Sequence, residues 1–213
     1  MKLNRHRQHG FTLAEMAIVV VLGGILLAAG LMAGRGQISR AQAQDVIQIA
    51  SDLQTASLSF KQRYGYLPGD WIYAANQLPG ITVGGTGGAQ GDGLIAGGIS
   101  AAGLVTAVNE VGVVPVQLYA AGLIGKLGTN PQMRLQSQFG AVHVAAATAA
   151  NTSAAYVAAN PAVRNVIIFF SLPCEVVLDV DRALDDGVDT TGRAMGIVAC
   201  TAGGSLTRYF VPL

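Results

Sequence analysis

The sequence contains little charge, few aromatic residues and almost no cysteine or histidine. Asp, Glu, Lys and Arg make up 12% of its 213 residues, aromatic residues 6%, and the formal net charge is +1. So small a net charge provides no basic field that would draw the protein onto nucleic acid, and we predict no nucleic-acid partner. Disorder is excluded, because 51% of the residues are hydrophobic and the chain is long enough to bury a core.

Residues suited to catalysis are equally scarce. Two of the three histidines, His6 and His9, lie in the first ten residues, which leaves His143. No serine occupies a Gly-x-Ser-x-Gly turn, and no Gly-x-x-x-x-Gly-Lys phosphate loop occurs. Without a nucleophile and base, or paired carboxylates in a pocket, we predict a structural protein rather than an enzyme, with no cofactor.

The apolar residues are concentrated in one block near the N-terminus. Residues 11–33 contain a single charge, Glu15, and as a helix they would span about 34 Å, enough to cross a bilayer core. The preceding Lys2, Arg5 and Arg7 are not accompanied by any acid. This asymmetry predicts a single membrane span with a cytoplasmic N-terminus and an exported remainder.

Two ordinary interpretations of this block are a secretory signal, cleaved near Ala28-Ala29-Gly30, and a plain signal anchor. Neither explains why a carboxylate lies inside the span, where it costs on the order of 2–4 kcal/mol. Neither explains why Gly10 stands at the junction between the charged and apolar residues.

The string Gly10-Phe11-Thr12-Leu13-Ala14-Glu15 closely resembles the processing site of type IV prepilins and type II secretion pseudopilins. The resemblance covers about the first thirty-five residues. It implies that a prepilin peptidase cuts after Gly10 and methylates the new amine of Phe11. Glu15 becomes the fifth residue of the mature chain, and residues 1–10 are a cytoplasmic leader that is removed.

We interpret Glu15 as an assembly residue. Cleavage leaves a cationic amine at Phe11, and Glu15 of a neighbouring subunit would neutralise it in a filament core of low dielectric constant. The hypothesis is that this pair sets the axial register of the subunits.

The sequence predicts one long helix from about Phe11 to Tyr64. Residues 11–34 form its apolar half, which serves as membrane span and filament core. Residues 35–64 form an amphipathic half with an apolar stripe of Val46, Ile49, Leu53, Ala56 and Phe60. Gly65 and Pro68 are a helix stop. Gly30, Gly34 and Gly36 at the junction either soften the helix or let helices approach closely, and the sequence leaves both open.

Residues 65–213 are predicted to form one exported head, with Trp71 in its core. Ten glycines in residues 80–104 indicate a long loop, in which Gln90-Gly91-Asp92-Gly93 favours a tight turn over a calcium loop. We expect a short helix over 116–124, ending at Gly125, and another over 182–186, capped by Gly187. Strands are expected over 165–172, 195–201 and 207–211. Residues 141–162 and 175–178 are ambiguous, and Asn151-Thr152-Ser153 is a weak glycosylation sequon.

These elements predict an α+β fold in which an antiparallel sheet of three or four strands packs on the amphipathic half of the helix. The resemblance implies the same pilin-like roll. Export favours a disulfide between Cys174 and Cys200, and many pilins close their C-terminal region in this way. The nearby Asp185, Asp186 and Asp189 are weak calcium candidates, and we favour an interpretation as helix and turn caps.

By resemblance, then, the chain is expected to be a subunit of a type IV pilus or a related filament. Its partners would be prepilin peptidase, an inner-membrane assembly platform, and copies of itself or other pilins. It would begin as a bacterial inner-membrane precursor and end in a periplasm-spanning or extracellular filament. The alternatives are a minor pilin, a type II secretion pseudopilin, a filament-displayed adhesion or DNA-binding module, and a simple membrane-anchored periplasmic domain.

Overall fold

The computed structural model describes residues 12–71, 77–78 and 85–213, and for residues 31–35 it describes the backbone alone. The chain divides into two units, Met1–Arg40 and Ala41–Leu213. The predicted glycine-rich loop 80–104 is therefore described from residue 85 onward.

The first element is a helix of 52 residues, α1, over Leu13–Tyr64. Its predicted first residue, Phe11, lies outside the described residues, and its end at Tyr64 is as predicted. Gly65 adopts a φ of +84° and donates its backbone N–H to the Lys61 carbonyl at 2.8 Å. This left-handed glycine is a common helix C-cap. Beyond it, Trp71 stacks on Tyr64, with ring centroids 5.1 Å apart, and it is partly buried against the core rather than fully within it.

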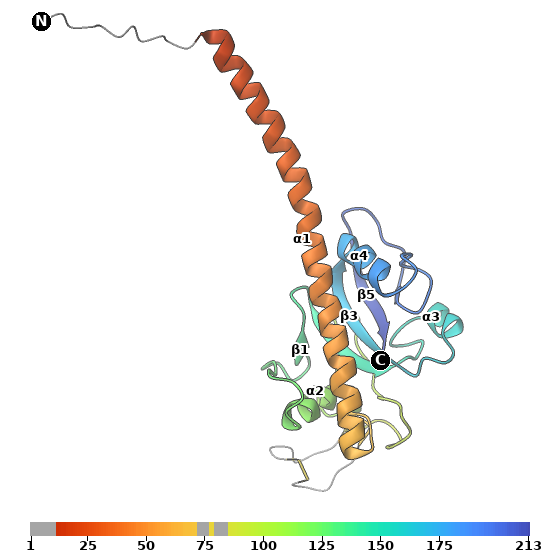
Figure 1. Ribbon diagram of the computed structural model, residues 1–213. Helices are drawn as coiled ribbons and strands as arrows, with labels where there is room; N and C mark the ends of the chain where they lie inside the picture. The colour runs from red at the N-terminus through yellow and green to blue at the C-terminus, as the bar shows by residue number, and fades with distance from the viewer. Residues whose placement is uncertain (1–11, 72–76, 79–84) are drawn as a thin grey trace, which may run out of the picture. The chain divides into compact units, whose positions relative to one another are not determined.

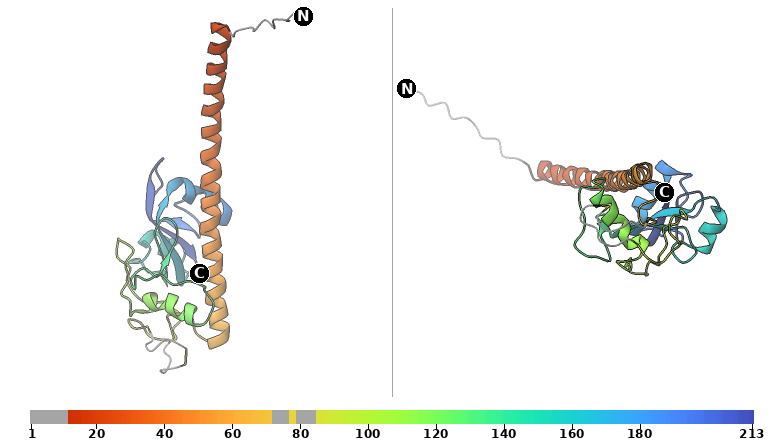
Figure 2. Two further views of the ribbon diagram at one scale, coloured as in Figure 1. Left: turned by 90° about the vertical axis from the view of Figure 1, so that its left-hand side faces the viewer. Right: turned by 90° about the horizontal axis from the view of Figure 1, so that it is seen from below.

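The second half of α1, Ala41 onward, belongs to the second unit and packs on its sheet (Figures 1 and 2). Of the predicted apolar stripe, Ile49 is only partly buried. The buried positions are Ala43, Val46, Ala50, Leu53, Ala56 and Phe60. Small residues at three of these positions let the helix axis approach the strands.

The sheet has five antiparallel strands in the order β1-β2-β3-β5-β4. Their bounds are β1 Leu135–Gln136, β2 Ala141–Ala146, β3 Asn165–Pro173, β4 Met195–Gly196 and β5 Ser205–Pro212. The α+β fold is confirmed, while the predicted strand count of three or four was too low.

Two predicted strands, 165–172 and 207–211, correspond to β3 and β5. The strand predicted over 195–201 was too long, because β4 ends at Gly196. Beyond it the Ile197 N–H still donates to the Arg208 carbonyl of β5 at 3.1 Å, whereas the Cys200 N–H donates to the Asp189 carboxylate.

The ambiguous alanine-rich region 141–162 contains both types of element. Every residue of β2 is buried, so its alanines fit a strand covered on both faces. A short helix, α3 over Ala154–Ala159, follows, and the Ser153 hydroxyl caps it by accepting the Tyr156 N–H at 3.1 Å.

The remaining helices start earlier than predicted. Helix α2 spans Glu110–Ala120 and contains Pro115, whereas the prediction began only after that proline. The Asn109 side chain caps α2 by accepting the Gly112 N–H at 2.9 Å, which fixes the first turn ahead of the proline. Helix α4 spans Cys174–Leu184 and so takes in residues 175–178. The predicted helix 182–186 is only its last turn, followed by Gly187 at a φ of +83°.

The glycine-rich segment from residue 85 onward is fastened by two buried carboxylates. Asp70 accepts the backbone N–H groups of Gly91 at 2.7 Å and Gly93 at 2.9 Å. Glu110 accepts that of Ala96 at 2.6 Å. The close approach requires glycine at residue 88, where a Cβ would lie 2.6 Å from a Glu110 carboxylate oxygen. The Asp92 carboxylate caps the predicted tight turn.

Asn151, the asparagine of the weak sequon, is 2% exposed and hydrogen-bonded inside the head. Its Nδ2 donates to the carbonyls of Gly97 at 2.9 Å and Ala146 at 3.2 Å. Its Oδ1 accepts the Ile99 N–H at 3.3 Å. The folded head therefore offers no free side-chain nitrogen at Asn151 for a glycan, and the residue ties the glycine-rich segment to β2.

Replacing Asn151 by alanine should lower the free energy of unfolding by about 2 kcal/mol, because the Ile99 N–H and the Gly97 carbonyl lose the partner that Asn151 provides, whereas the Ala146 carbonyl keeps the Thr148 N–H. Trp71 fluorescence during urea unfolding measures this change. Asn130→Ala is the matched control, since Asn130 makes one exposed bond to the Gln132 N–H and should change stability by less than about 0.5 kcal/mol. Equal losses in both variants would contradict the structural role of Asn151.

Candidate processing and assembly segment

Helix α1 begins with a reciprocal cap between Thr12 and Glu15. The Thr12 backbone N–H and hydroxyl donate to the Glu15 carboxylate at 2.8 and 2.9 Å, and the Glu15 N–H donates to the Thr12 hydroxyl at 3.2 Å. This is a capping box, with threonine at the N-cap and an acid three residues later. The sequence carried that signal in Thr12-Leu13-Ala14-Glu15, but Glu15 was interpreted only through its charge.

The cap places the Glu15 carboxylate beside the predicted cleavage point. Gly10 and Phe11 lie outside the described residues, so cleavage after Gly10 and methylation of Phe11 stay predictions. Thr12, whose N–H Glu15 accepts, directly follows Phe11. A cationic amine created at Phe11 would therefore lie one residue from that carboxylate. That amine would also lie at the N-terminal end of α1, where the helix dipole is positive. The negative charge of Glu15 would stabilise both the helix end and the amine.

The helix behind this cap is apolar and uncovered. Residues Leu13–Gly30 have a mean hydropathy of 2.3 and none is buried, so α1 is long and apolar enough to cross a membrane. Leu13 is 91% exposed, and Val20 and Leu26 are 70% and 73% exposed. Contiguous apolar surface of this extent requires lipid or other apolar helices around it.

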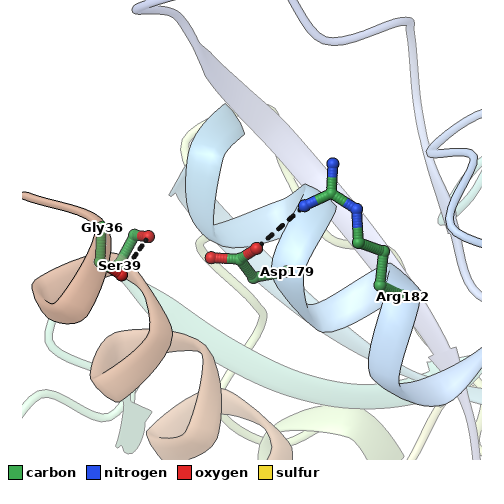
Figure 3. Close-up of polar contacts among 4 residues, drawn as sticks. All are labelled: Gly36, Ser39, Asp179 and Arg182. Carbon is green, nitrogen blue, oxygen red and sulfur yellow. Dashed lines mark hydrogen bonds and ion pairs between the residues drawn. The ribbon is translucent and has the colours of Figure 1, made fainter. Parts of the chain in front are cut away.

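Four glycines of this segment make no contact with other described residues that would require glycine, and Gly34 lies outside the residues whose side-chain surroundings are described. A Cβ added at Gly23, Gly24, Gly30 or Gly36 would meet nothing within 4 Å. Just beyond Gly36, the Ser39 hydroxyl donates to the Gly36 carbonyl at 3.3 Å, a local bond that competes with the helix ladder (Figure 3). These observations suit close approach by another helix as well as a softened helix.

The head contains the predicted disulfide, which joins Cys174 to Cys200. Their Cα atoms are 5.4 Å apart and 26 positions apart in sequence. Cys174 is the first residue of α4 and donates its backbone N–H to the Gly204 carbonyl at 3.0 Å. The bridge therefore fixes the start of α4 to the loop that leads into β5.

Three of the acidic residues between the two cysteines, Asp185, Asp186 and Asp189, act as caps for their own loop. Asp185 accepts the Ala194 N–H at 2.9 Å, and Asp186 accepts the Val188 N–H at 2.9 Å. Asp189 accepts the Cys200 N–H. In the described part of the chain, no three His, Cys, Asp or Glu residues are grouped so that they could hold a metal ion. The calcium prediction at Asp185, Asp186 and Asp189 thus lacks a ligand cluster to support it.

Two further contacts involve acidic side chains of α4 and of the loop that follows it. The Thr191 hydroxyl donates to Asp186 at 2.6 Å, and this bond is the main reason that the pKa of Asp186 is lowered. On α4, Arg182 forms an ion pair with Asp179 at 3.0 Å (Figure 3). Being solvent-exposed, that pair contributes little to stability.

Asp181 is a buried acid that the sequence interpretation did not single out. It is fully buried on α4, and the Tyr209 hydroxyl of β5 donates to its Oδ2 at 2.8 Å. Its Oδ1 has no hydrogen-bond partner among the residues that the structure describes. Burial raises the pKa of Asp181, with smaller contributions from the charges of Asp186 and Asp185. In the sequence, Asp181 is one of five aspartates over residues 179–189, and nothing local distinguishes it because its partner Tyr209 lies 28 positions away.

Asp181→Asn should make the head's stability less dependent on pH. The raised pKa means that the folded state holds the Asp181 proton more tightly than the unfolded state does. Stability from this group is therefore present at acidic pH and is lost as pH rises through the folded-state pKa. Urea unfolding at pH 4 and pH 7 should show a smaller loss in Asp181→Asn than in the wild type. A loss of the same size in both proteins would rule out Asp181 as its source.

Comparison with known protein families gives one result for this segment. Residues 5–31 match the prokaryotic N-terminal methylation motif, the signature of type IV pilins and pseudopilins. No curated protein and no solved structure matches the chain. The motif covers the predicted cleavage point, the capping box and most of the apolar helix. It implies processing by prepilin peptidase and polymerisation with other pilins.

Proposed function

We propose that the protein is a structural subunit of a type IV pilus or a related filament. It is made as an inner-membrane precursor, cut after Gly10, methylated at Phe11 and polymerised through α1. The observation that carries this proposal is the continuity of the methylation motif with an uncovered apolar helix that begins at a Thr12–Glu15 cap.

The same apolar surface suits two successive surroundings. Before assembly, residues Leu13–Gly30 are long enough for the hydrocarbon core of the inner membrane. After extraction by an inner-membrane assembly platform, the same side chains pack against the helices of other subunits. The head, closed by its disulfide, supplies the filament surface.

Within this class we favour a pilin over a type II secretion pseudopilin. In addition to the helix and the sheet, the head contains the glycine-rich segment, which is held by hydrogen bonds to Asp70 and Glu110. Such a segment enlarges the displayed surface without contributing a strand of the sheet. Abundance of the chain in filaments sheared from cells separates a major pilin from a minor pilin or pseudopilin.

Mass spectrometry of the mature N-terminus tests the proposal. The expected chain lacks residues 1–10 and begins with a methylated Phe11. Gly10→Val should retain the leader, because the peptidase recognises the small residue before the cut, whereas Gly23→Ala should be processed normally. An intact Met1 would indicate a membrane-anchored periplasmic domain. A chain that begins after Gly30 would indicate a secretory signal, and either result would overturn the proposal.

A further inference from the structure

The head contains a pocket of about 620 Å³ beside the last turns of α1. Its walls come from α1, from the loop between α3 and β3, and from the end of β5. This volume lies in the range of sites that hold small organic molecules. The pocket belongs entirely to the second unit and uses neither the processing segment nor the disulfide.

The charges around this pocket have one sign. Lys61, Arg164 and Arg193 line it from three different parts of the fold, and no Asp or Glu side chain is among the described lining residues. Arg164 is held in place because its Nη2 donates to the Asp92 carbonyl at 2.7 Å. The structure shows no ion pair for the side chains of Lys61 and Arg193 with any described residue.

The lining of the pocket also includes apolar surface. Leu58, Leu67 and Val163 contribute aliphatic side chains. Leu67 and Val163 are partly buried against the core, and Leu58 is 59% exposed. The apolar side chains and the cations therefore border the same pocket.

We propose that this pocket binds a small organic anion with an apolar body. The apolar body contacts Leu58, Leu67 and Val163, and the anionic group lies among Lys61, Arg164 and Arg193. Cations on three separate segments select for negative charge, and the aliphatic side chains select against small inorganic anions.

Anilinonaphthalene sulfonate is a suitable probe, because it joins an aromatic body to a sulfonate. The full-length protein in detergent micelles is titrated with this dye, and energy transfer from Trp71 is recorded. Trp71 is the only tryptophan and belongs to the head, so transfer reports dye on the head rather than in the micelle. Phenylnaphthylamine, which has the same body without the sulfonate, is the neutral comparison.

We expect saturable transfer to the sulfonate and much weaker transfer to the neutral dye. Lys61→Gln/Arg193→Gln should weaken sulfonate binding about tenfold, and added salt should weaken it further. Lys126→Gln/Arg182→Gln removes the same charge from exposed sites outside the pocket and should bind as the wild type does.

Three results would overturn the proposal. One is equal binding of the two dyes. Another is equal weakening of sulfonate binding in both double variants, which would indicate a general electrostatic effect of the protein's charge rather than binding in the pocket. The third is dye affinity that falls as protein concentration rises, because a second copy of the chain would then occupy the pocket. The titration uses unprocessed protein, so its outcome is independent of cleavage and assembly.

Discussion

Glu15→Leu should be processed normally and yet yield almost no filaments. The leader and Gly10 are unchanged, so the peptidase meets the same junction. In the assembled core, however, the amine of Phe11 would lack a counter-charge, and an unpaired charge in a medium of low dielectric constant is costly. Shearing of surface filaments followed by immunoblotting measures assembly, and the mass of the cell-associated subunit measures processing. A normal yield of filaments would refute the assembly role of Glu15.

The capping box makes a sharper version of this experiment possible. Glu15→Gln keeps an acceptor for the Thr12 N–H, because glutamine also serves in capping boxes, but removes the charge. Thr12→Val keeps the charge and removes the hydroxyl that binds Glu15. If the charge pair drives assembly, Glu15→Gln should fail like Glu15→Leu, while processed Thr12→Val should still assemble. The reverse pattern would assign Glu15 to helix capping.

Removal of the disulfide should cost the head about 3 kcal/mol of stability, the value for a closed loop of this length. Cys174→Ala/Cys200→Ala frees the start of α4 from the loop before β5, although the Asp189 contact to Cys200 N–H persists. Urea unfolding of the oxidised wild type and of the variant, followed by Trp71 fluorescence, measures the difference.

Reduction of the wild type supplies the control for the disulfide variant. The reduced protein and Cys174→Ala/Cys200→Ala should unfold at the same urea concentration, since both lack the same covalent bond. Titration of the secreted form should detect no free thiol before reduction. Two reactive thiols in that form, or an unchanged unfolding midpoint after reduction, would contradict the predicted contribution.

Local signals predicted those parts of the fold that local chemistry decides. The end of α1 follows from Gly65, whose left-handed backbone stops the helix, and β3 and β5 follow from runs of β-branched and aromatic residues. Strand β2 gave a mixed signal, because its alanines favour helix whereas Val142 and Val144 favour strand, and burial of every residue accompanies the strand.

Distant partners decide the rest. Residues 175–178 are ambiguous by composition, and the structure places them in α4, whose Val176, Val177 and Val180 are buried in the core. Likewise, Asp181 meets Tyr209 only after β5 is in place, and Lys61 of the pocket lies more than a hundred residues before Arg164 and Arg193. For the assembly segment, the sequence motif predicts roles for Gly10, Phe11 and Glu15. The capping role of Thr12 follows only from the structure at the start of α1.

The way in which the glycine-rich segment is fastened has a consequence for how the head can evolve. Asp70 and Glu110 accept hydrogen bonds from the main-chain amides of residues 91, 93 and 96. A main-chain amide is present in any residue other than proline, whatever its side chain. Side chains near these anchor points can therefore vary only where the backbone has ordinary φ values, whereas the backbone at Gly91 and Gly93, with φ of +77° and +79°, favours glycine. Under the proposed function, the head would keep this framework while other exposed side chains change.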